Sequence, residues 1–290
     1  MHLLVTGGTG FVGTSVVEYF VSRGHQVSVL VRLKDSLVSQ GCFAADMTDL
    51  DSLTKSASSL GEIDAIVHLA TCKQSNRIMD FLDTNCVGLS NLLLVTSSRR
   101  IPRFINVSGV AVVGTPKYSP IDESHPCEPQ TIYQASKLLA ERILHSHQTA
   151  ECSRISLRIT APIGKNMPED RFLSHCVRSA ISGSPISVYG QGLRRQNYID
   201  VSDVCVGIDL ALHSSAEGPV ILGGAKSYTN LDLARLVVSV LDSNSTVQHG
   251  NVHDPEDALD WHVDIGLAKR LLGYEPSCSM IESIRRIASC

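Results

Sequence analysis

A glycine-rich turn near the N-terminus constrains the fold more than any other feature of the chain. Residues 2–6 form a short apolar run, and residues 7–13 then read GGTGFVG. Apolar side chains recur at helical spacing through residues 14–24, where Gly24 ends the pattern, and residues 25–31 read as a second buried strand. Strand, glycine turn, helix and strand together predict a βαβ unit, and therefore a parallel sheet.

The glycines of this turn fit two overlapping patterns, Gly8-x-Gly10-x-x-Gly13 and Gly7-x-x-Gly10-x-x-Gly13. In either pattern one glycine makes the tight turn, one lets the backbone approach a pyrophosphate, and one lets helix and strand pack closely. The free N–H groups at the start of the helix attract phosphate. The turn therefore predicts the binding of a dinucleotide.

The end of the second strand bears on which dinucleotide binds. An acidic residue there would hold the adenosine ribose of NAD, but Val31 and Arg32 occupy the place. An arginine can pair with the 2′-phosphate of NADP, and Lys34 could assist it. The alternative is a solvated arginine on a loop. We favour NADP over NAD.

Strand-like and helix-like segments keep alternating after this unit, in residues 41–53, 63–70, 85–100 and 101–109. The alternation predicts an α/β protein with a doubly wound parallel sheet of the Rossmann type and a smaller C-terminal substrate-binding region. We expect a discontinuous dinucleotide-binding domain of residues 1–160 and 197–224. Residues 161–196 and 225–290 would form the substrate-binding region.

Composition excludes several classes of function. Charged residues make up 19% of the 290 residues and the formal charge is −4, so the chain lacks the excess of positive charge that is typical of nucleic-acid-binding proteins. No apolar run approaches the ~20 residues that a membrane span needs. Nine cysteines stand singly, which indicates reduced thiols in a cytoplasmic protein. Residues 249–262 hold histidines and acids, but we interpret them as a polar loop and predict no metal site.

Residues 131–137, TIYQASK, place Tyr133 and Lys137 four positions apart, on one face of a predicted helix. A free tyrosine has a pKa of ~10, which makes it a poor base near neutrality. A nearby ammonium stabilises the tyrosinate and brings its pKa toward the working range of an acid–base catalyst. The same spacing also occurs in ordinary surface pairs, so the interpretation depends on the rest of the chain.

The motifs, taken in order, resemble a known family. Eight segments follow the order seen in extended short-chain dehydrogenases/reductases: VTGGTGFVG, AADMTDL, VHLA, Asn85 with Gly88, FINVSG, YQASK, LRIT and NYIDVSDV. The chain is most similar to their NAD(P)-dependent sugar epimerase/dehydratase family, and the resemblance covers nearly its whole length. It implies a cofactor site, a nucleotide-activated sugar as substrate, and a homodimer built partly from the helix of Tyr133.

The resemblance also implies individual roles. Asp46 and Met47 would contact adenine, Leu69 to Thr71 would line the middle of the cofactor, and Asn85 would brace the helix beside the active site. The expected cofactor contacts are Gly7, Thr9, Gly10, Phe11, Val12, Gly13, Arg32, Asp46, Met47, Leu69, Ala70, Thr71, Asn85 and Lys137.

For catalysis the resemblance implies Tyr133 as acid and base, Lys137 as its partner on the nicotinamide ribose, and a hydroxyl at the end of the fifth strand. The family's usual hydroxyl position falls on Gly109 in a gapless comparison, whereas counting back from Tyr133 gives Ser108. We therefore predict Ser108, with Thr71 or a water as substitutes.

The resemblance also implies substrate contacts from Thr71, Arg195 and Gln196. In the family's segment that GQG and NYIDVSDV resemble, an arginine meets the nucleotide diphosphate, and a guanidinium suits phosphate oxygens. The predicted function is an NAD(P)-dependent oxidoreductase or epimerase acting on a nucleotide-activated sugar. A keto-sugar reductase that consumes NADPH is the closest alternative, since Arg32 favours NADP. A non-catalytic NADP-binding regulatory protein is the third.

Overall fold

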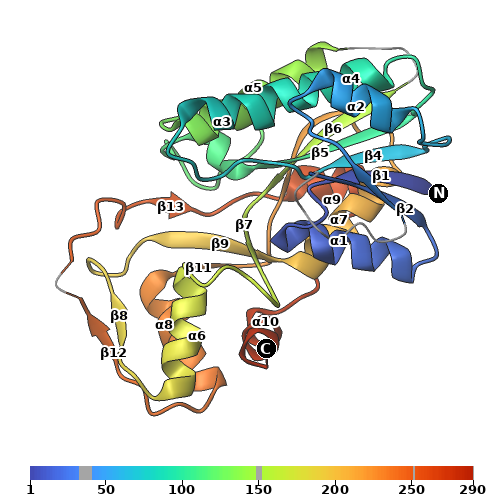
Figure 1. The fold of residues 1–290 in the computed structure, drawn as a ribbon. Helices are drawn as coiled ribbons and strands as arrows, with labels where there is room; N and C mark the ends of the chain where they lie inside the picture. The colour runs from blue at the N-terminus through green and yellow to red at the C-terminus, as the bar shows by residue number, and fades with distance from the viewer. Residues whose placement is uncertain (33–40, 148–151, 251, 290) are drawn as a thin grey trace.

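A computed structural model of the chain describes residues 1–32, 41–147, 152–250 and 252–289 (Figure 1). Its centre is a parallel seven-stranded sheet with the order β10-β6-β5-β4-β1-β2-β3. The strands are β1 (His2–Thr6), β2 (Gln26–Val31), β3 (Cys42–Ala44), β4 (Ala65–His68), β5 (Arg103–Gly109), β6 (Ser153–Ile159) and β10 (Gly218–Leu222). The predicted doubly wound α/β fold is confirmed.

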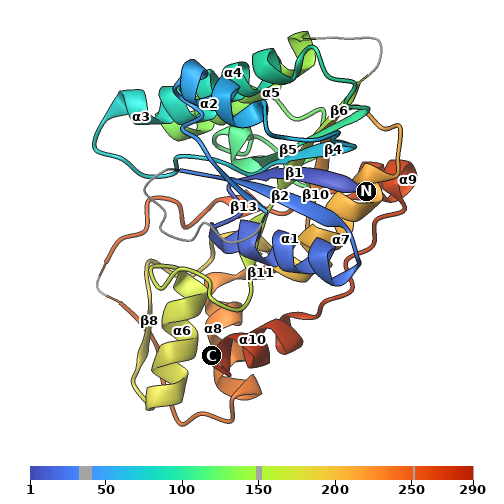
Figure 2. The same ribbon diagram turned by 45° about the vertical axis from the view of Figure 1, so that its right-hand side comes forward.

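Helices cover both faces of this sheet, as the turned view shows (Figure 2). On one face lie α1 (Phe11–Ser22), α7 (Val201–Leu212) and α9 (Gly266–Leu272), and on the other lie α2 (Leu50–Ala57), α4 (Gly88–Thr96) and α5 (Ile132–Ser146). Alternation within β1 explains the two cores, since Leu3 and Val5 join the first cluster and Leu4 joins the second. Strands that are buried on both faces read as continuous apolar runs for this reason.

Helix ends follow local signals. Asp49 caps α2 by accepting hydrogen bonds from Asp51 N and Ser52 N. Thr131 caps α5 in a reciprocal capping box with Gln134, which fixes where the helix of Tyr133 begins.

One helical stretch differs from the sequence expectation. Ile78–Thr96, comprising α3 (Ile78–Leu82), the π-helical turn η1 (Asp83–Val87) and α4, is long and apolar enough to cross a membrane by length and composition. The expectation that no apolar segment approaches this length is therefore wrong. In the fold the stretch packs against α2 and α5, where Leu89 and Leu92 are buried. Packing on the sheet accounts for these apolar side chains.

A second lobe lies below the sheet in Figure 1. It holds a four-stranded sheet and a parallel pair, and its helices α6, α8 and α10 share one apolar cluster. Its elements are β7 (Ala161–Ile163), α6 (Phe172–Ser182), β8 (Ile186–Val188), β9 (Arg195–Asp200), β11 (Ser227–Thr229), α8 (Asn230–Val240), β12 (Val247–His249), β13 (Asp260–Trp261) and α10 (Met280–Ala288). A short 3₁₀ turn, η2 (Val110–Val113), follows β5.

The division of the chain into 1–160 with 197–224 and 161–196 with 225–290 stays a prediction. Most of β9 falls within the predicted segment 197–224 of the dinucleotide-binding domain, but β9 pairs with β7, β11 and β13 and not with the main sheet. From the region beyond residue 225, α9 packs its Ala268 and Leu272 into the main core.

Asp203 on α7 anchors the chain that enters α10. Its carboxylate is 1% exposed and accepts hydrogen bonds from Ser277 N, Ser277 Oγ and Cys278 N at 3.0–3.1 Å.

We predict that Asp203→Asn lowers the free energy of unfolding by about 1–3 kcal/mol, because an amide cannot accept all three bonds and leaves a buried donor unpaired. Urea denaturation measures the change. Asp232→Asn, an exposed residue in the first turn of α8, is the control, with an expected change within about 0.5 kcal/mol. Equal stability of the two variants would contradict the anchoring role.

Candidate active site

The carboxyl ends of β1, β2, β4 and β5 meet at one edge of the sheet, and the glycine turn lies there. Gly7 has φ +72°, and a Cβ on it would lie 2.5 Å from Ala70 N. A Cβ on Gly13 would lie 2.0 Å from the Gly7 carbonyl oxygen. Only glycine fits both positions, so the turn brings helix, strand and the loop after β4 into close contact.

The start of α1 is open to a ligand. Gly10 is its N-cap residue with no side-chain cap, and no acidic residue stands in the first turn. Thr9 and Gly10 are exposed, while Val12 packs on the main core and Phe11 packs on the apolar cluster of the second lobe. The first N–H groups of the helix are thus available to a phosphate, and this turn fits a dinucleotide diphosphate.

Arg32 stands exposed directly after β2, at the same edge. Burial raises the pKa of the Cys72 thiol in the loop after β4, and the charge of Arg32 lowers that pKa in part. Lys34 lies outside the described residues.

Asp46 and Met47 follow β3 and are half-buried. The Asp46 carboxylate accepts from Thr48 N at 2.9 Å and Thr48 Oγ1 at 2.7 Å, which fixes a tight turn. Met47 lies beside Gly88, and its carbonyl accepts from Asn91 Nδ2 at 2.9 Å. Both residues stand on the side of β1 where β2 and β3 lie.

Asn85 ties the loop after β4 to α5. Its Oδ1 accepts from Cys72 N at 2.7 Å and Thr71 Oγ1 at 3.1 Å, and its Nδ2 donates to Cys72 O at 3.1 Å and Ser136 Oγ at 2.8 Å. The residue is 2% exposed and lies in the π-helical turn η1, a feature common at functional sites. The Thr71 hydroxyl is therefore engaged by Asn85. Leu69 and Ala70, before it, donate their N–H groups to Thr6.

Lys137 is buried beside the fifth strand. Its ammonium donates to Val107 O at 2.8 Å, and the side chain is 5% exposed. Burial lowers its pKa to about 8, with a further lowering by Lys73 and an opposing effect of Glu141. Burial and the charge of Lys137 together lower the pKa of His68 to about 3, so this histidine is neutral.

Tyr133 lies one turn before Lys137 and is half-buried. Burial raises the pKa of its phenol, and the charge of Arg171 lowers it in part. The sequence expectation assigned that lowering to Lys137, whereas the charge that acts on the phenol comes from the residue preceding α6.

Ser108 lies on the sheet face that α5 covers. In β5 the side chains of Phe104 and Asn106 point to this face, and Ser108 follows their alternation. Its hydroxyl is closed off from solvent and has no partner among the described residues. Gly109, next along, is half-buried and carries no side chain.

Sequence reasoning missed two cations, Lys73 and Arg171. Lys73 is exposed, but the surrounding chain desolvates its ammonium and lowers its pKa. The charge of Arg171 lowers this pKa further, and the charge of Asp170 raises it. Lys73 stands five residues after β4, so its place at a strand's carboxyl end was an available signal. No local pattern marked Arg171.

The two residues expected at a diphosphate lie on β9. Arg195 is about half exposed and its Nη1 lies 3.5 Å from Asp260 Oδ2, while Arg194 pairs with Glu256 at 2.7 Å. Gln196 is flanked by Tyr228 on β11 and by Trp261 on β13. Both arginines thus already have carboxylate partners from residues 249–262, the polar loop recognised in the sequence.

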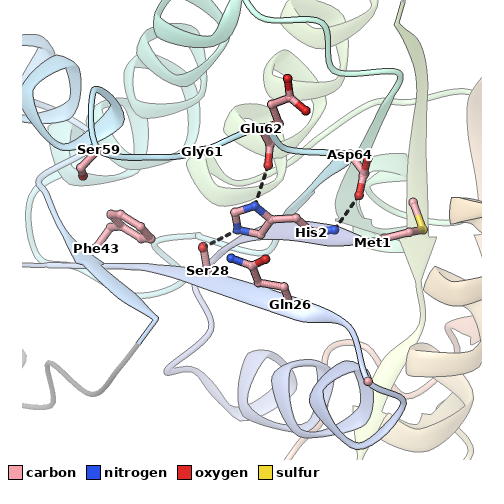
Figure 3. A pocket seen from close by; sticks show the side chains of 10 residues that line it. Met1, His2, Gln26, Ser28, Phe43, Ser59, Gly61, Glu62 and Asp64 are labelled. Carbon is pink, nitrogen blue, oxygen red and sulfur yellow. Dashed lines mark hydrogen bonds between the residues drawn. The ribbon is translucent and has the colours of Figure 1, made fainter.

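A separate hollow opens at the opposite edge of the sheet (Figure 3). Its polar groups satisfy one another, since the His2 ring contacts Glu62 O at 2.6 Å and Ser28 Oγ at 2.7 Å, and Asp64 Oδ2 accepts from His2 N at 2.6 Å. It lies at the amino ends of the strands, away from Tyr133. The part of the chain that the structure describes brings together no group of three or more histidine, cysteine, aspartate or glutamate side chains that could hold a metal.

Several proteins of known activity are similar to this chain. UDP-glucuronic acid decarboxylase 1 of Arabidopsis thaliana is 30% identical over 100% of this chain and 69% of its own length. A dTDP-glucose 4,6-dehydratase of Streptomyces niveus is 27% identical over 98% of this chain and 90% of its own length.

Solved structures share the fold. A UDP-glucose 4-epimerase of Thermotoga maritima, solved with UDP-glucose, superposes with a TM-score of 0.89 at 21% identity, covering 100% of this chain and 98% of that one. A UDP-glucose 4-epimerase of Thermus thermophilus, solved with NAD, gives 0.86 at 23% identity with the same coverage. The family model described as "NAD dependent epimerase/dehydratase family" matches residues 3–223. The predicted family is thereby confirmed, and the chain belongs to the NAD-dependent epimerase/dehydratase family, whose members include enzymes of the extended short-chain dehydrogenase/reductase type.

Proposed function

We propose that the protein is an NAD(P)-dependent enzyme that transforms a nucleotide-activated sugar, with epimerisation as the first candidate and reduction of a keto-sugar as the second. The placement of Tyr133 and Lys137 carries the proposal, because both lie at the edge where the glycine turn fits a dinucleotide. Family membership and relatives that are named for UDP- and dTDP-sugars support the substrate class.

Tyr133, Lys137 and Ser108 have separate proposed roles in the reaction. A bound nicotinamide would supply the acceptor or donor of hydride. The Tyr133 phenolate takes the proton of a sugar hydroxyl and becomes the phenol, or the phenol returns that proton in the reverse direction, and the Lys137 ammonium binds the ribose beside it. Ser108, whose hydroxyl is unpaired, donates to the reacting oxygen and stabilises its developing charge.

Other proposed cofactor contacts follow the edge of the sheet. The first turn of α1 holds the diphosphate, Asp46 and Met47 hold the adenine, and Leu69 to Thr71 line the middle. Arg195 and Gln196 are proposed for the diphosphate of the substrate, and there Arg195 would exchange Asp260 for phosphate oxygens.

The first prediction concerns Tyr133→Phe. Loss of the hydroxyl removes the proton carrier but no apolar contact, so we expect kcat to fall by roughly 10²–10⁴-fold while the Kd for the dinucleotide stays within about twofold. Turnover of UDP- and dTDP-sugars, followed by nicotinamide absorbance and by product analysis, measures kcat. Unchanged turnover in the variant would favour the non-catalytic binding protein.

The second prediction concerns the cofactor. We propose NADP over NAD because Arg32 is exposed at the end of β2, although solved relatives contain NAD. Arg32→Ala should weaken NADP binding about 10–100-fold, since a charge-assisted hydrogen bond contributes about 1.5–3 kcal/mol, and should leave NAD binding within about twofold. Titration calorimetry measures both. Arg23→Ala, a half-exposed arginine at the far end of α1, serves as control. If the wild-type protein binds NAD alone, the preference for NADP is refuted.

We also propose a homodimer. Large apolar side chains stand exposed on the helical stretch 78–96 and on α5, namely Ile78, Met79, Val87, Leu94, Ile132 and Leu139. Exposed apolar side chains on neighbouring helices are typical of a surface that a partner covers.

Leu94→Glu combined with Leu139→Glu should convert the dimer to a monomer, because two buried carboxylates per subunit would lack partners. Sedimentation at several concentrations measures the state. Val21→Glu, an exposed apolar residue on α1, should leave the dimer intact. A wild-type protein that sediments as a monomer at all concentrations would overturn the proposal.

A further inference from the structure

Glu141 extends the line of functional residues on α5. Positions 133, 137 and 141 are spaced by four, so Tyr133, Lys137 and Glu141 share one face of the helix. Glu141 is 3% exposed and stands one turn after the lysine. A carboxylate so deeply buried requires a compensating charge.

Arg158 on β6 supplies part of that compensation. Its Nε lies 3.1 Å from Glu141 Oε1 and 3.2 Å from Oε2, and its Nη2 lies 2.7 Å from Oε2. Both side chains are 4% exposed. The forked geometry fixes the position of the carboxylate beneath α5, because two parallel bonds restrict both distance and orientation.

Stability alone is a weak reason for this pair. A buried ion pair can often be replaced by apolar side chains of similar volume at no cost in stability, since desolvation offsets the attraction. The Arg158 side chain also has a hydrogen bond with Cys127. Two charged side chains are thus buried on a face that apolar residues could fill.

The charges around Lys137 show what the pair achieves. The charges that act on Lys137 come from Glu141 on α5, Lys73 after β4 and Cys86 on η1, and Lys137 itself acts on His68 on β4. Tyr133 lies one turn before it on α5, and Arg158 on β6 holds the Glu141 carboxylate. His68 is neutral because its pKa is lowered to about 3, and burial raises the pKa of the Cys86 thiol. Glu141 favours the charged form of Lys137, and Lys73 opposes it.

We propose that Glu141, locked in place by Arg158, is a positioning residue that keeps Lys137 as an ammonium at the Val107 carbonyl. Arg158 fixes the carboxylate, and the carboxylate offsets the desolvation of the lysine. The active-site lysine then stays charged near neutral pH. Because this role presupposes the proposed function of Lys137, its test is a titration that requires neither cofactor nor substrate.

The experiment follows the side-chain resonances of isotopically labelled lysines in the full-length protein over a range of pH, with Lys137 assigned through Lys137→Arg. In Glu141→Gln the neutral amine should appear at a pH lower by about one unit or more than in the wild-type protein, because an attractive charge is gone. Glu141→Asp keeps the charge and should titrate near the wild type. Asp203→Asn, which removes a similarly buried carboxylate in the first turn of α7, should leave Lys137 unchanged.

Glu141→Gln leaves the Arg158 guanidinium buried and unpaired, which could prevent folding. The double variant Glu141→Gln, Arg158→Gln removes both charges and must still lower the titration of Lys137. An unchanged titration in whichever variant folds overturns the proposal and leaves the pair a packing feature. The two proposals can fail separately. If Lys137 titrates at lower pH in the Glu141 variants while Tyr133→Phe keeps full turnover, the role of Glu141 is supported and the proposed function is refuted.

Discussion

Two buried polar side chains, Lys137 and Asn85, hold α5 against the edge of the sheet, and the geometry of the site depends on them. Lys137 reaches Val107 O on β5, and Asn85 reaches Ser136 on α5 while its other atoms hold the loop after β4. A buried amide or ammonium that loses its partner costs about 1–3 kcal/mol or more, so α5 cannot slide or rotate without leaving groups unpaired. The helix that carries Tyr133 is therefore fixed relative to the turn that receives the dinucleotide.

Much of the fold was accessible from the sequence because its signals are local. Glycine is required at positions 7 and 13 by close approaches within a few residues or across adjacent strands, and the caps Asp49 and Thr131 bond N–H groups two or three positions away. Buried parallel strands read as apolar runs whatever their neighbours are. Such features predict each element and the alternation that gives a doubly wound sheet.

Features that depend on pairing between distant segments were not accessible in this way. Most of β9 falls within the predicted dinucleotide-binding domain, but β9 pairs with β11 and β13 outside the main sheet, and short strands carry no mark of their partner. The membrane-length helix 78–96 arises from three helical segments that run on without a break, although only part of it had read as helical. Family resemblance selected the candidate residues, whereas their electrostatic surroundings emerge only from the fold.

The electrostatics of Tyr133 show the difference most clearly. Spacing on α5 pointed to Lys137 as the charge that activates the phenol, yet the Lys137 ammonium is engaged by the Val107 carbonyl. Burial raises the phenol pKa, and the charge that lowers it in part belongs to Arg171, which precedes the first helix of the second lobe. The pKa of Tyr133 thus depends on a residue about 40 positions away along the chain, which no spacing on α5 could indicate.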